Sequence, residues 1–325
     1  MNFSAILDTV GNWAWGPPML ILLCGTHLFL TFRLRFIQRY IPHAIRLSLQ
    51  RTSEGEGDIS HFGALTTALA ATIGTGNIVG VATAIALGGP GAVLWMWLTG
   101  VFGIATKYAE ALLSVKYRIA TPQGTMAGGP MYVLERGMKN KPLAIFFAAM
   151  TAIAAFGIGN MVQANSISTL VQETFRVPTW ITGAVMTVLT AIVIIGGIKS
   201  IARSCEKLVP FMALFYVLGC AILLVMGWRT IPHTVALILQ SAFTGHAAVG
   251  GFAGAGVMAA MRYGVARGLF SNESGMGSAP IVAAAAQTKT PVRQALVSST
   301  GTFWDTVVVC AMTGLVLVNS GEWVN

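Results

Sequence analysis

Long apolar stretches alternate with short polar connections along almost the whole chain. A helix needs roughly 20 mostly apolar residues to cross the hydrocarbon core of a bilayer. By that length we predict eight transmembrane helices, with the ranges 13–32, 61–87, 91–115, 142–170, 179–198, 208–227, 240–261 and 294–319. The pattern therefore predicts an all-α polytopic membrane protein, with residues 1–325 forming a single transmembrane domain.

The composition agrees with this pattern and argues against an enzyme. Hydrophobic residues make up 55% of the 325 residues and charged residues only 10%, whereas about a quarter of a soluble domain is charged. The five histidines are scattered and form no metal-binding spacing, and no GxSxG nucleophile motif occurs. We interpret the four widely spaced cysteines as packing residues, and we expect no cofactor.

The basic residues indicate how the predicted helices are oriented. Seventeen of the 20 Lys and Arg residues fall in the odd-numbered connections, while only Arg176 and Arg229 fall in the even-numbered ones. The positive-inside rule then places the odd-numbered connections in the cytoplasm and the N-terminus outside. The net charge of +9 is thus a topology signal with some attraction to anionic lipid, and we expect no nucleic-acid binding.

The second predicted helix contains a conformational weak point at residues 74–80, GTGNIVG. A dinucleotide-binding loop is excluded, because that motif must follow a buried strand. The glycines are also compatible with simple close packing of helices. A second run, GGFAGAG at 250–256, lies in the seventh predicted helix, five helices later. Two interrupted helices at matching places of two halves are typical of a transporter's binding site.

A broken helix offers ligands its own backbone. One half-helix end exposes free N–H groups that suit a carboxylate, and the other exposes free carbonyls that suit a cation. Non-helical backbone at membrane depth is tolerated only beside protein or a cavity. We therefore predict a carrier, with a channel as an alternative because broken helices also build selectivity filters.

Several ordered motifs carry a resemblance to a known family. The chain resembles the sodium:alanine symporter family, the alanine or glycine:cation symporters, in the segments 57–97, KYAEALLSVKYR (107–118), MAGGPMYVLERG (126–137), FGIGNMVQANS (156–166), GGIKSIA (196–202), RGLFSNESGMGSAPIVAAAA (267–286) and 293–316. The resemblance implies sodium-coupled symport of small neutral amino acids into the cytoplasm by alternating access. It also implies a multi-pass protein of the cell membrane, the inner membrane if the source is bacterial.

The same resemblance implies a LeuT-type fold of inverted five-helix repeats after one extra helix. The extra helix would be 13–32, the first repeat 61–227 and the start of the second repeat 240–319. About eight of the eleven helices expected for that fold are counted, so we expect an incomplete second repeat and a C-terminal truncation. The alternative function is then a truncated membrane fragment without transport activity of its own.

The resemblance also implies site residues in the first interrupted helix. The N–H groups of Thr75 and Gly76 would bind the substrate carboxylate, and Asn77 would orient it or ligate an ion. The co-transported sodium ion would be held by oxygens of the same segment, mainly backbone carbonyls, in Ala70, Thr72 and Ile73. Oxygen ligands suit a hard cation.

The other expected site residues lie in later helices. Gln163 would contact the substrate or form a bond between helices, and Phe252 with Ala253 and Gly254 would supply the second broken segment. The partners would be alanine or glycine, sodium and the lipid bilayer. The sequence leaves open L-alanine, D-alanine or glycine, sodium or proton coupling, stoichiometry and oligomeric state.

Three charged features inside or beside the predicted helices have no assigned role. Lys107 and Glu110 stand three apart on one helix and share a face, so we expect them to pair, as a structural element or part of an inner gate. Asp305 is either functional or a hydrogen-bond partner of a neighbouring helix. The segment SNESG (271–275) is expected in a cytoplasmic connection, as a hinge or gate.

Overall fold

The computed structural model describes residues 5, 9–11, 13, 15–50, 55–244 and 256–324. Within these residues the protein is helical apart from one antiparallel hairpin, whose strands are β1 (Ile119–Ala120) and β2 (Met126–Ala127). The predicted all-α class is confirmed. The LeuT-type arrangement of the helices stays a prediction.

Fifteen α-helices are described, together with two 3-10 turns and four π-helical segments. The α-helices are α2 (Pro17–Arg33), α3 (Ile41–Ser48), α4 (His61–Thr72), α5 (Val81–Gly88), α6 (Ala92–Lys116), α7 (Pro130–Tyr132), α8 (Lys141–Ala154), α9 (Val162–Phe175), α10 (Thr179–Ile195), α11 (Gly197–Met226), α12 (Ile231–Thr244), α13 (Val257–Asn272), α14 (Ala279–Ala284), α15 (Pro291–Thr302) and α16 (Ala311–Ser320). The 3-10 turns are η1 (Ile37–Tyr40) and η6 (Glu322–Val324). The π-helical segments are η2 (Gly76–Gly80), η3 (Val133–Gly137), η4 (Ala155–Met161) and η5 (Phe303–Cys310).

Several of these helices are long and apolar enough to cross a membrane. Three qualify among the described residues, Lys141–Phe175, Gly197–Met226 and Pro291–Ser320, and two bent pairs raise the number to five. One of those pairs is the second predicted helix, bent by 53° between α4 and the helix that begins at Gly76. The seventh predicted helix, 240–261, covers the end of α12 and the start of α13.

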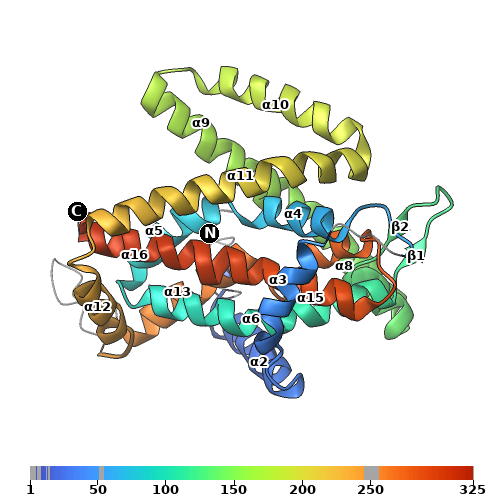
Figure 1. Ribbon diagram of the computed structural model, residues 1–325, viewed down its shortest axis with the longest axis horizontal. Helices are drawn as coiled ribbons and strands as arrows, with labels where there is room; N and C mark the ends of the chain where they lie inside the picture. The colour runs from blue at the N-terminus through green and yellow to red at the C-terminus, as the bar shows by residue number, and fades with distance from the viewer. Residues whose placement is uncertain are drawn as a thin grey trace.

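Helix α6 lies at the centre of the molecule, and α2, α13 and α15 all pack against it. Figure 1 shows α4 beneath α11, and α9 with α10 forming a hairpin that projects away from the other helices. Gly264 and Gly268 allow the closest of these contacts. A Cβ on Gly264 would overlap the Ala92 carbonyl, and one on Gly268 would overlap Thr99 Oγ1, which is the small-residue packing of membrane helices.

The first, third, fifth and seventh connections meet at one end of the bundle. Asp58 N–H donates to the Ala285 carbonyl at 2.7 Å, and Met126 N–H donates to Asp58 Oδ2 at 2.8 Å. Ser60 Oγ donates to Glu206 Oε1 at 2.6 Å. The β1–β2 hairpin marks this end in Figure 1, and α12 lies at the opposite end. Arg118 also lies at this end, where it donates to the carbonyls of Ala284 and Ala286 at 2.9 and 2.7 Å, whereas Arg262 and Arg267 lie within α13.

Large apolar side chains are exposed on the outer helices. Ile195, Phe211 and Phe215 are each more than 70% exposed. Such a continuous apolar exterior has no favourable contact with water, but it suits the hydrocarbon of a bilayer.

Candidate functional site

The first interruption lies between α4 and η2. Helix α4 begins after Ser60, whose Oγ accepts a hydrogen bond from Gly63 N–H at 2.8 Å and so caps the helix. It ends at Thr72 because Ile73 takes an extended conformation, with φ −77° and ψ 107°. Helical structure resumes near Gly76, so the predicted weak point is a real break in the helix.

At this break the side chain of Asn77 takes the place of a backbone hydrogen-bond acceptor. In a continuous helix Gly74 N–H would bond the Ala70 carbonyl, but it donates to Asn77 Oδ1 at 2.7 Å. Likewise Asn77 N–H would bond the Ile73 carbonyl, but it donates to Gly74 O at 3.2 Å. The carbonyls of Ala70 and Ile73 thus lose the amides that a regular helix would give them. These are the two carbonyls that the family resemblance implied as sodium ligands.

The amide group of Asn77 points into a buried polar cluster. Its Nδ2 donates to Asp305 Oδ1 at 2.8 Å and to Ser271 Oγ at 3.0 Å. Asp305 is fully buried and also accepts from Ser271 Oγ at 2.9 Å and Thr306 Oγ1 at 2.7 Å. A buried carboxylate needs such donors, because burying it without partners is very costly. Asp305 therefore ties η5 to the first interruption, which is the hydrogen-bonding role considered for it.

A second interruption separates α13 from α14. Glu273, Gly275 and Gly277 all have positive φ, at 53°, +91° and +84°, and glycine is the residue that tolerates this conformation best. Residues 250–255 of the segment GGFAGAG, with Phe252, Ala253 and Gly254, lie outside the described residues. The interruption that the structure describes is therefore at 273–278.

This second interruption was expected as a connection, and the structure corrects that expectation. Ser271, Asn272 and Ser274 of SNESG are buried, with exposures of 2%, 1% and 0%. The reason is local: Ser271 bonds Asp305, and Ser274 Oγ lies 3.0 Å from Thr302 Oγ1. Polar side chains in this segment are satisfied inside the protein.

The first interruption lies against the C-terminal end of α13, directly before the second interruption. A Cβ on Gly76 would lie 3.6 Å from Ser271 Cα and 3.8 Å from the Phe270 ring. A small substituent therefore fits there in ordinary van der Waals contact, while a long side chain would have to displace α13. Segments almost 200 residues apart in sequence meet at this point, through the hydrogen bond from Asn77 to Ser271.

A cavity of about 300 Å³ lies beside this contact, and we call it the central cavity. Its lining comes from the first interruption, from α8, η4 and α9, and from the second interruption, through Ala70, Ala71, Thr72, Gly76, Thr151, Ala154, Ala155, Gly159, Gln163, Phe270, Glu273, Met276 and Ser278. The volume is at the small end of ligand pockets. Glu273 is the one charged residue in this lining, so the cavity offers a carboxylate to a cationic group.

The side chain of Gln163 accepts a hydrogen bond from a backbone amide of the first interruption. Its Oε1 accepts from Thr75 Oγ1 at 3.0 Å and from Thr75 N–H at 3.4 Å. The side-chain oxygen thus stands where a carboxylate oxygen would bind. Thr72 Oγ1 donates to the carbonyls of Ala68 and Leu69, at 3.3 and 3.4 Å, so its hydroxyl hydrogen is directed at its own helix.

Lys107 and Glu110 differ from their expected pairing. Lys107 Nζ is buried and has no hydrogen-bond partner in the described part of the structure. Glu110 Oε2 is also buried there without a hydrogen-bond partner, and Glu110 lines a cavity together with Gly275 and Gly277. The two side chains thus form no hydrogen-bonded pair, although the Lys107 ammonium group acts electrostatically on the Glu110 carboxylate.

Comparison with known proteins decides the family. The sequence profile described as the sodium:alanine symporter family matches residues 1–325. The chain belongs to this family. Because members of this family are transporters, this symporter is not an enzyme.

Individual relatives agree with the family match. The symporter is 54% identical over 328 residues to "Sodium/alanine symporter AgcS" of Methanococcus maripaludis, covering 99% of this chain and 72% of that protein. It is 53% identical over 327 residues to an "Uncharacterized transporter" of Haemophilus influenzae, covering 100% and 72%. It is 36% identical over 321 residues to "Probable sodium/glutamine symporter GlnT" of Bacillus subtilis, covering 98% and 66%.

Three residues of the symporter's central cavity were missed by sequence reasoning. Phe270 lies at the end of α13, and Glu273 and Met276 belong to the second interruption. Their signal was present in the sequence, since NESGMGS (272–278) combines two glycines with polar residues after an apolar helix. The predicted break at 250–256 lies almost entirely outside the described residues and stays a prediction.

Proposed function

We propose that this chain performs sodium-coupled symport of alanine, and of glycine as a smaller substrate, by alternating access in the membrane. Family membership and the AgcS relative support sodium and alanine. The observation that carries the proposal is that residues of both helix interruptions line one cavity, where Gly76 and Glu273 lie close to the Ala70 carbonyl that has lost its helical amide partner.

Each part of an amino-acid zwitterion has a matching group in the central cavity. The substrate carboxylate binds the N–H groups of Thr75 and Gly76, displacing Gln163 Oε1 from Thr75. The freed Gln163 side chain then donates to the bound carboxylate through its Nε2. The substrate ammonium group faces the carboxylate of Glu273. Charge-assisted hydrogen bonds of this kind are about twice as strong as neutral ones.

Phe270 and Met276 set the size of the substrate. Phe270 lines the central cavity from the end of α13 and Met276 from the second interruption, and they leave room for a methyl group beside Gly76. We assign to Phe270 the role of closing the substrate pocket at this wall. Larger side chains require rearrangement of this wall, which gives preference for small amino acids.

The sodium ion binds at the carbonyls of Ala70 and Ile73. Both have lost their helical amide partners, and carbonyl oxygens are good ligands for a hard cation. Thr72 contributes its hydroxyl oxygen, whose hydrogen already points to Ala68 and Leu69. The ion and the substrate carboxylate lie at opposite faces of one interruption, so each binds better when the other neutralises its charge.

In the membrane, the end of the bundle that carries the odd-numbered connections faces the cytoplasm and the N-terminus faces outside. The distribution of Lys and Arg supports this orientation. The outward-facing side chains of α10 and α11 contact lipid. The fold is the LeuT-type inverted repeat, with the two interruptions in its first and sixth core helices.

Uptake into proteoliposomes tests the proposal. Purified symporter is reconstituted with sodium outside, and labelled alanine accumulation is measured with sodium and with choline. We expect saturable accumulation above the external concentration that requires the sodium gradient. Uptake that never exceeds the external concentration and does not saturate would instead indicate a channel, and no uptake at all would reject the function for this chain.

A further inference from the structure

The segments that lead into α4 and out of α14 lie side by side at the end of the bundle that carries the β1–β2 hairpin. Residues 56–59 lie just before α4, the half-helix that ends at the first interruption. Residues 285–288 follow α14, the half-helix that begins after the second interruption. Glu56 pairs with Thr288, and Ile59 with Ala286, as β-bridges. Two half-helices that are far apart in sequence are thus joined at their ends.

Backbone hydrogen bonds hold the two segments together, and we call the paired residues 56–59 and 285–288 the clasp. Four amides donate across it: those of Asp58 and Ile59 to the Ala285 carbonyl at 2.7 and 3.2 Å, that of Gln287 to the Ile59 carbonyl at 2.8 Å, and that of Thr288 to the Glu56 carbonyl at 3.3 Å. Because the bonds run in both directions, neither segment can move away without breaking its own and its partner's contacts.

The close approach of the two segments depends on a glycine and on a buried apolar layer. A Cβ on Gly57 would overlap the backbone amide of Gln287, so another residue at this position would push the segments apart. Ile59 and Ala286 are 5% and 0% exposed, and they belong to one apolar cluster with Ala64 in the first turn of α4. The clasp is therefore continuous with the packing of α4.

Arg118, just after the end of α6, binds both segments of the clasp. Its Nη1 donates to the carbonyls of Ala284 and Ala286 at 2.9 and 2.7 Å, and its Nη2 donates to the Glu56 carbonyl at 2.7 Å. A guanidinium group presents several donors in a fixed planar fork, whereas a lysine ammonium is a single compact charge. One side chain thus closes the clasp across three backbone carbonyls.

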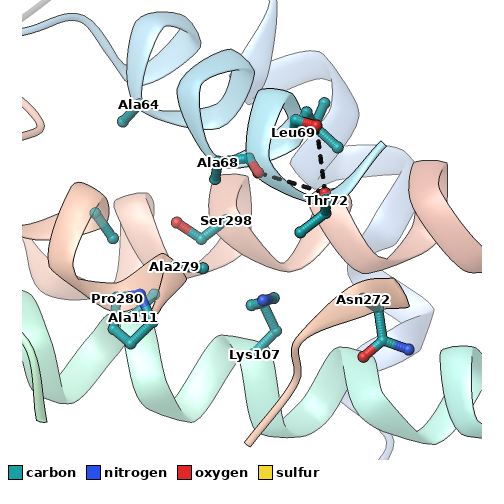
Figure 2. A pocket seen from close by; sticks show the side chains of 12 residues that line it. Ala64, Ala68, Leu69, Thr72, Lys107, Ala111, Asn272, Ala279, Pro280 and Ser298 are labelled. Carbon is teal, nitrogen blue, oxygen red and sulfur yellow. Dashed lines mark hydrogen bonds between the residues drawn. The ribbon is translucent and has the colours of Figure 1, made fainter. Parts of the chain in front are cut away.

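The half-helices also pack closely behind the clasp. Figure 2 shows Ala64 and Thr72 of α4 on one side of a small cavity, with Pro280 of α14 and Ala111 of α6 on the other. The cavity is about 10 Å³, which is close to the space that one water needs. Ser114 Oγ of α6 donates to the Pro280 carbonyl at 2.6 Å. Helices α4 and α14 and the end of α6 therefore form one packed unit.

The opposite wall of the central cavity has fewer polar links to this unit. That wall comes from α8, η4 and α9. Among the described residues, the hydrogen bonds that cross from it to the interruptions all belong to Gln163, which accepts from Thr75 N–H and Thr75 Oγ1. None of the described residues that line the central cavity belongs to the clasp. The cavity can thus open along α8 and α9 while the clasp stays shut.

We propose that Arg118 is a positioning residue that closes the clasp, and that α4 and α14 move as one body, with the clasp shut, when the central cavity opens. The motion rests on the proposed transport function, whereas the clasp rests on the hydrogen bonds of the structure. A rigid-body motion keeps the contacts inside the moving unit. It also keeps the two interruptions in register with each other.

Hydrogen–deuterium exchange of the purified symporter tests the clasp without requiring transport. The variants are Arg118→Ala and Arg118→Lys, and the matched control is Lys116→Ala, which removes an exposed cation at the end of α6. We expect 56–59 and 285–288 to exchange at least about tenfold faster in Arg118→Ala, because three hydrogen bonds from a charged donor are lost. In Arg118→Lys we expect about threefold in both segments, because one ammonium cannot span the three carbonyls.

The control should exchange like wild type. Exchange that stays unchanged in Arg118→Ala, or that rises in only one of the two segments, overturns the clasp. If Arg118→Ala does not fold, the same two outcomes in Arg118→Lys overturn it.

A disulfide across the clasp tests whether it stays shut during transport. Glu56 and Thr288 face each other across an antiparallel bridge, where Cα atoms lie about 4.5–5.5 Å apart, within the range that a disulfide needs. The double variant Glu56→Cys with Thr288→Cys is oxidised in proteoliposomes, and sodium-driven alanine uptake is measured before and after reduction. Each single variant serves as the matched control for oxidation.

Because contacts inside a rigid body do not change, we expect the disulfide-bonded protein to keep at least about half of the uptake of the reduced protein. A larger loss that reduction restores overturns the motion with a shut clasp. A folded double variant that forms no disulfide overturns the pairing itself. Absence of uptake in wild type, with faster exchange in Arg118→Ala, would reject the transport function and with it the motion, while the clasp stands.

Discussion

Replacing Asn77 with alanine perturbs the first interruption at its centre. The substitution removes the Oδ1 that accepts from Gly74 N–H at 2.7 Å and the Nδ2 that donates to Asp305 Oδ1 at 2.8 Å. Gly74 N–H is then free to bond the Ala70 carbonyl, as in a regular helix. The carbonyl proposed for sodium thus gains a competing partner.

The magnitude follows from the hydrogen bonds that change. A re-formed backbone hydrogen bond contributes about 1 kcal/mol net, and that energy must be recovered before sodium binds Ala70. Since 1.4 kcal/mol corresponds to a factor of ten, we expect sodium affinity to fall about fivefold. Loss of a donor to the buried Asp305 carboxylate costs a further ~2 kcal/mol of stability, because that charge then keeps fewer partners.

The assay is the sodium concentration for half-maximal alanine uptake, together with the thermal midpoint of the purified protein. The matched control is Asn165→Ala, which removes the same side chain from an exposed position on α9. We expect the control to match wild type in both measurements. An Asn77→Ala protein that keeps wild-type sodium dependence would refute the assignment of sodium to the carbonyls of this break.

Three further substitutions test other parts of the site. Gly76→Leu should abolish alanine binding while Gly76→Ala keeps most of it, since a Cβ at this position meets its neighbours only at 3.6 Å; equal loss in both, measured by labelled-alanine binding, would argue against a steric effect. Phe270→Ala should widen the central cavity. Competition uptake assays should then show at least about fivefold better inhibition by larger neutral amino acids such as glutamine. Unchanged selectivity would show that Phe270 does not limit the size of the substrate. Glu273→Gln should raise the KM for alanine about tenfold by removing the charge that faces the ammonium group, and an unchanged KM would show that the ammonium binds elsewhere.

Removing the buried ammonium group of Lys107 should destabilise the fold more than the substitutions at Gly76, Phe270 and Glu273. Lys107→Met leaves Asp305 and Glu110 without their shared counter-charge, and breaking such buried charge balance typically costs about 3–5 kcal/mol. The check is the thermal midpoint of the purified protein, with Lys116→Met at the end of α6 as the control. Equal stability of the two variants would contradict the charge balance described for Lys107.

The first interruption could be predicted from sequence because its causes are local. Glycines around Thr75 and Asn77 weaken the helix, and Asn77 supplies the competing hydrogen bond three residues from Gly74. The same reasoning did not locate the break at 273–278, because polar residues there resemble an exposed connection. Only the packing of α13 against α6 and η5 shows that Ser271 and Ser274 are buried.

The contacts that join the first interruption to α13 and η5 could not be predicted from one sequence. Asn77 and Asp305 lie 228 residues apart, and no local pattern links them. The spacing of Lys107 and Glu110 correctly suggested a shared helix face, but spacing alone does not show what else that face contacts. The structure places Glu110 around one cavity with Gly275 and Gly277, more than 160 residues away in sequence.

The most direct test of the account is an experimental structure of the symporter with alanine and sodium bound. The account predicts the amino acid in the central cavity, with its carboxylate on the N–H groups of Thr75 and Gly76 and the oxygen of Gln163 displaced from Thr75. It also predicts sodium at the carbonyls of Ala70 and Ile73. Alanine bound away from both interruptions, with the bond between Gln163 and Thr75 intact, would contradict it.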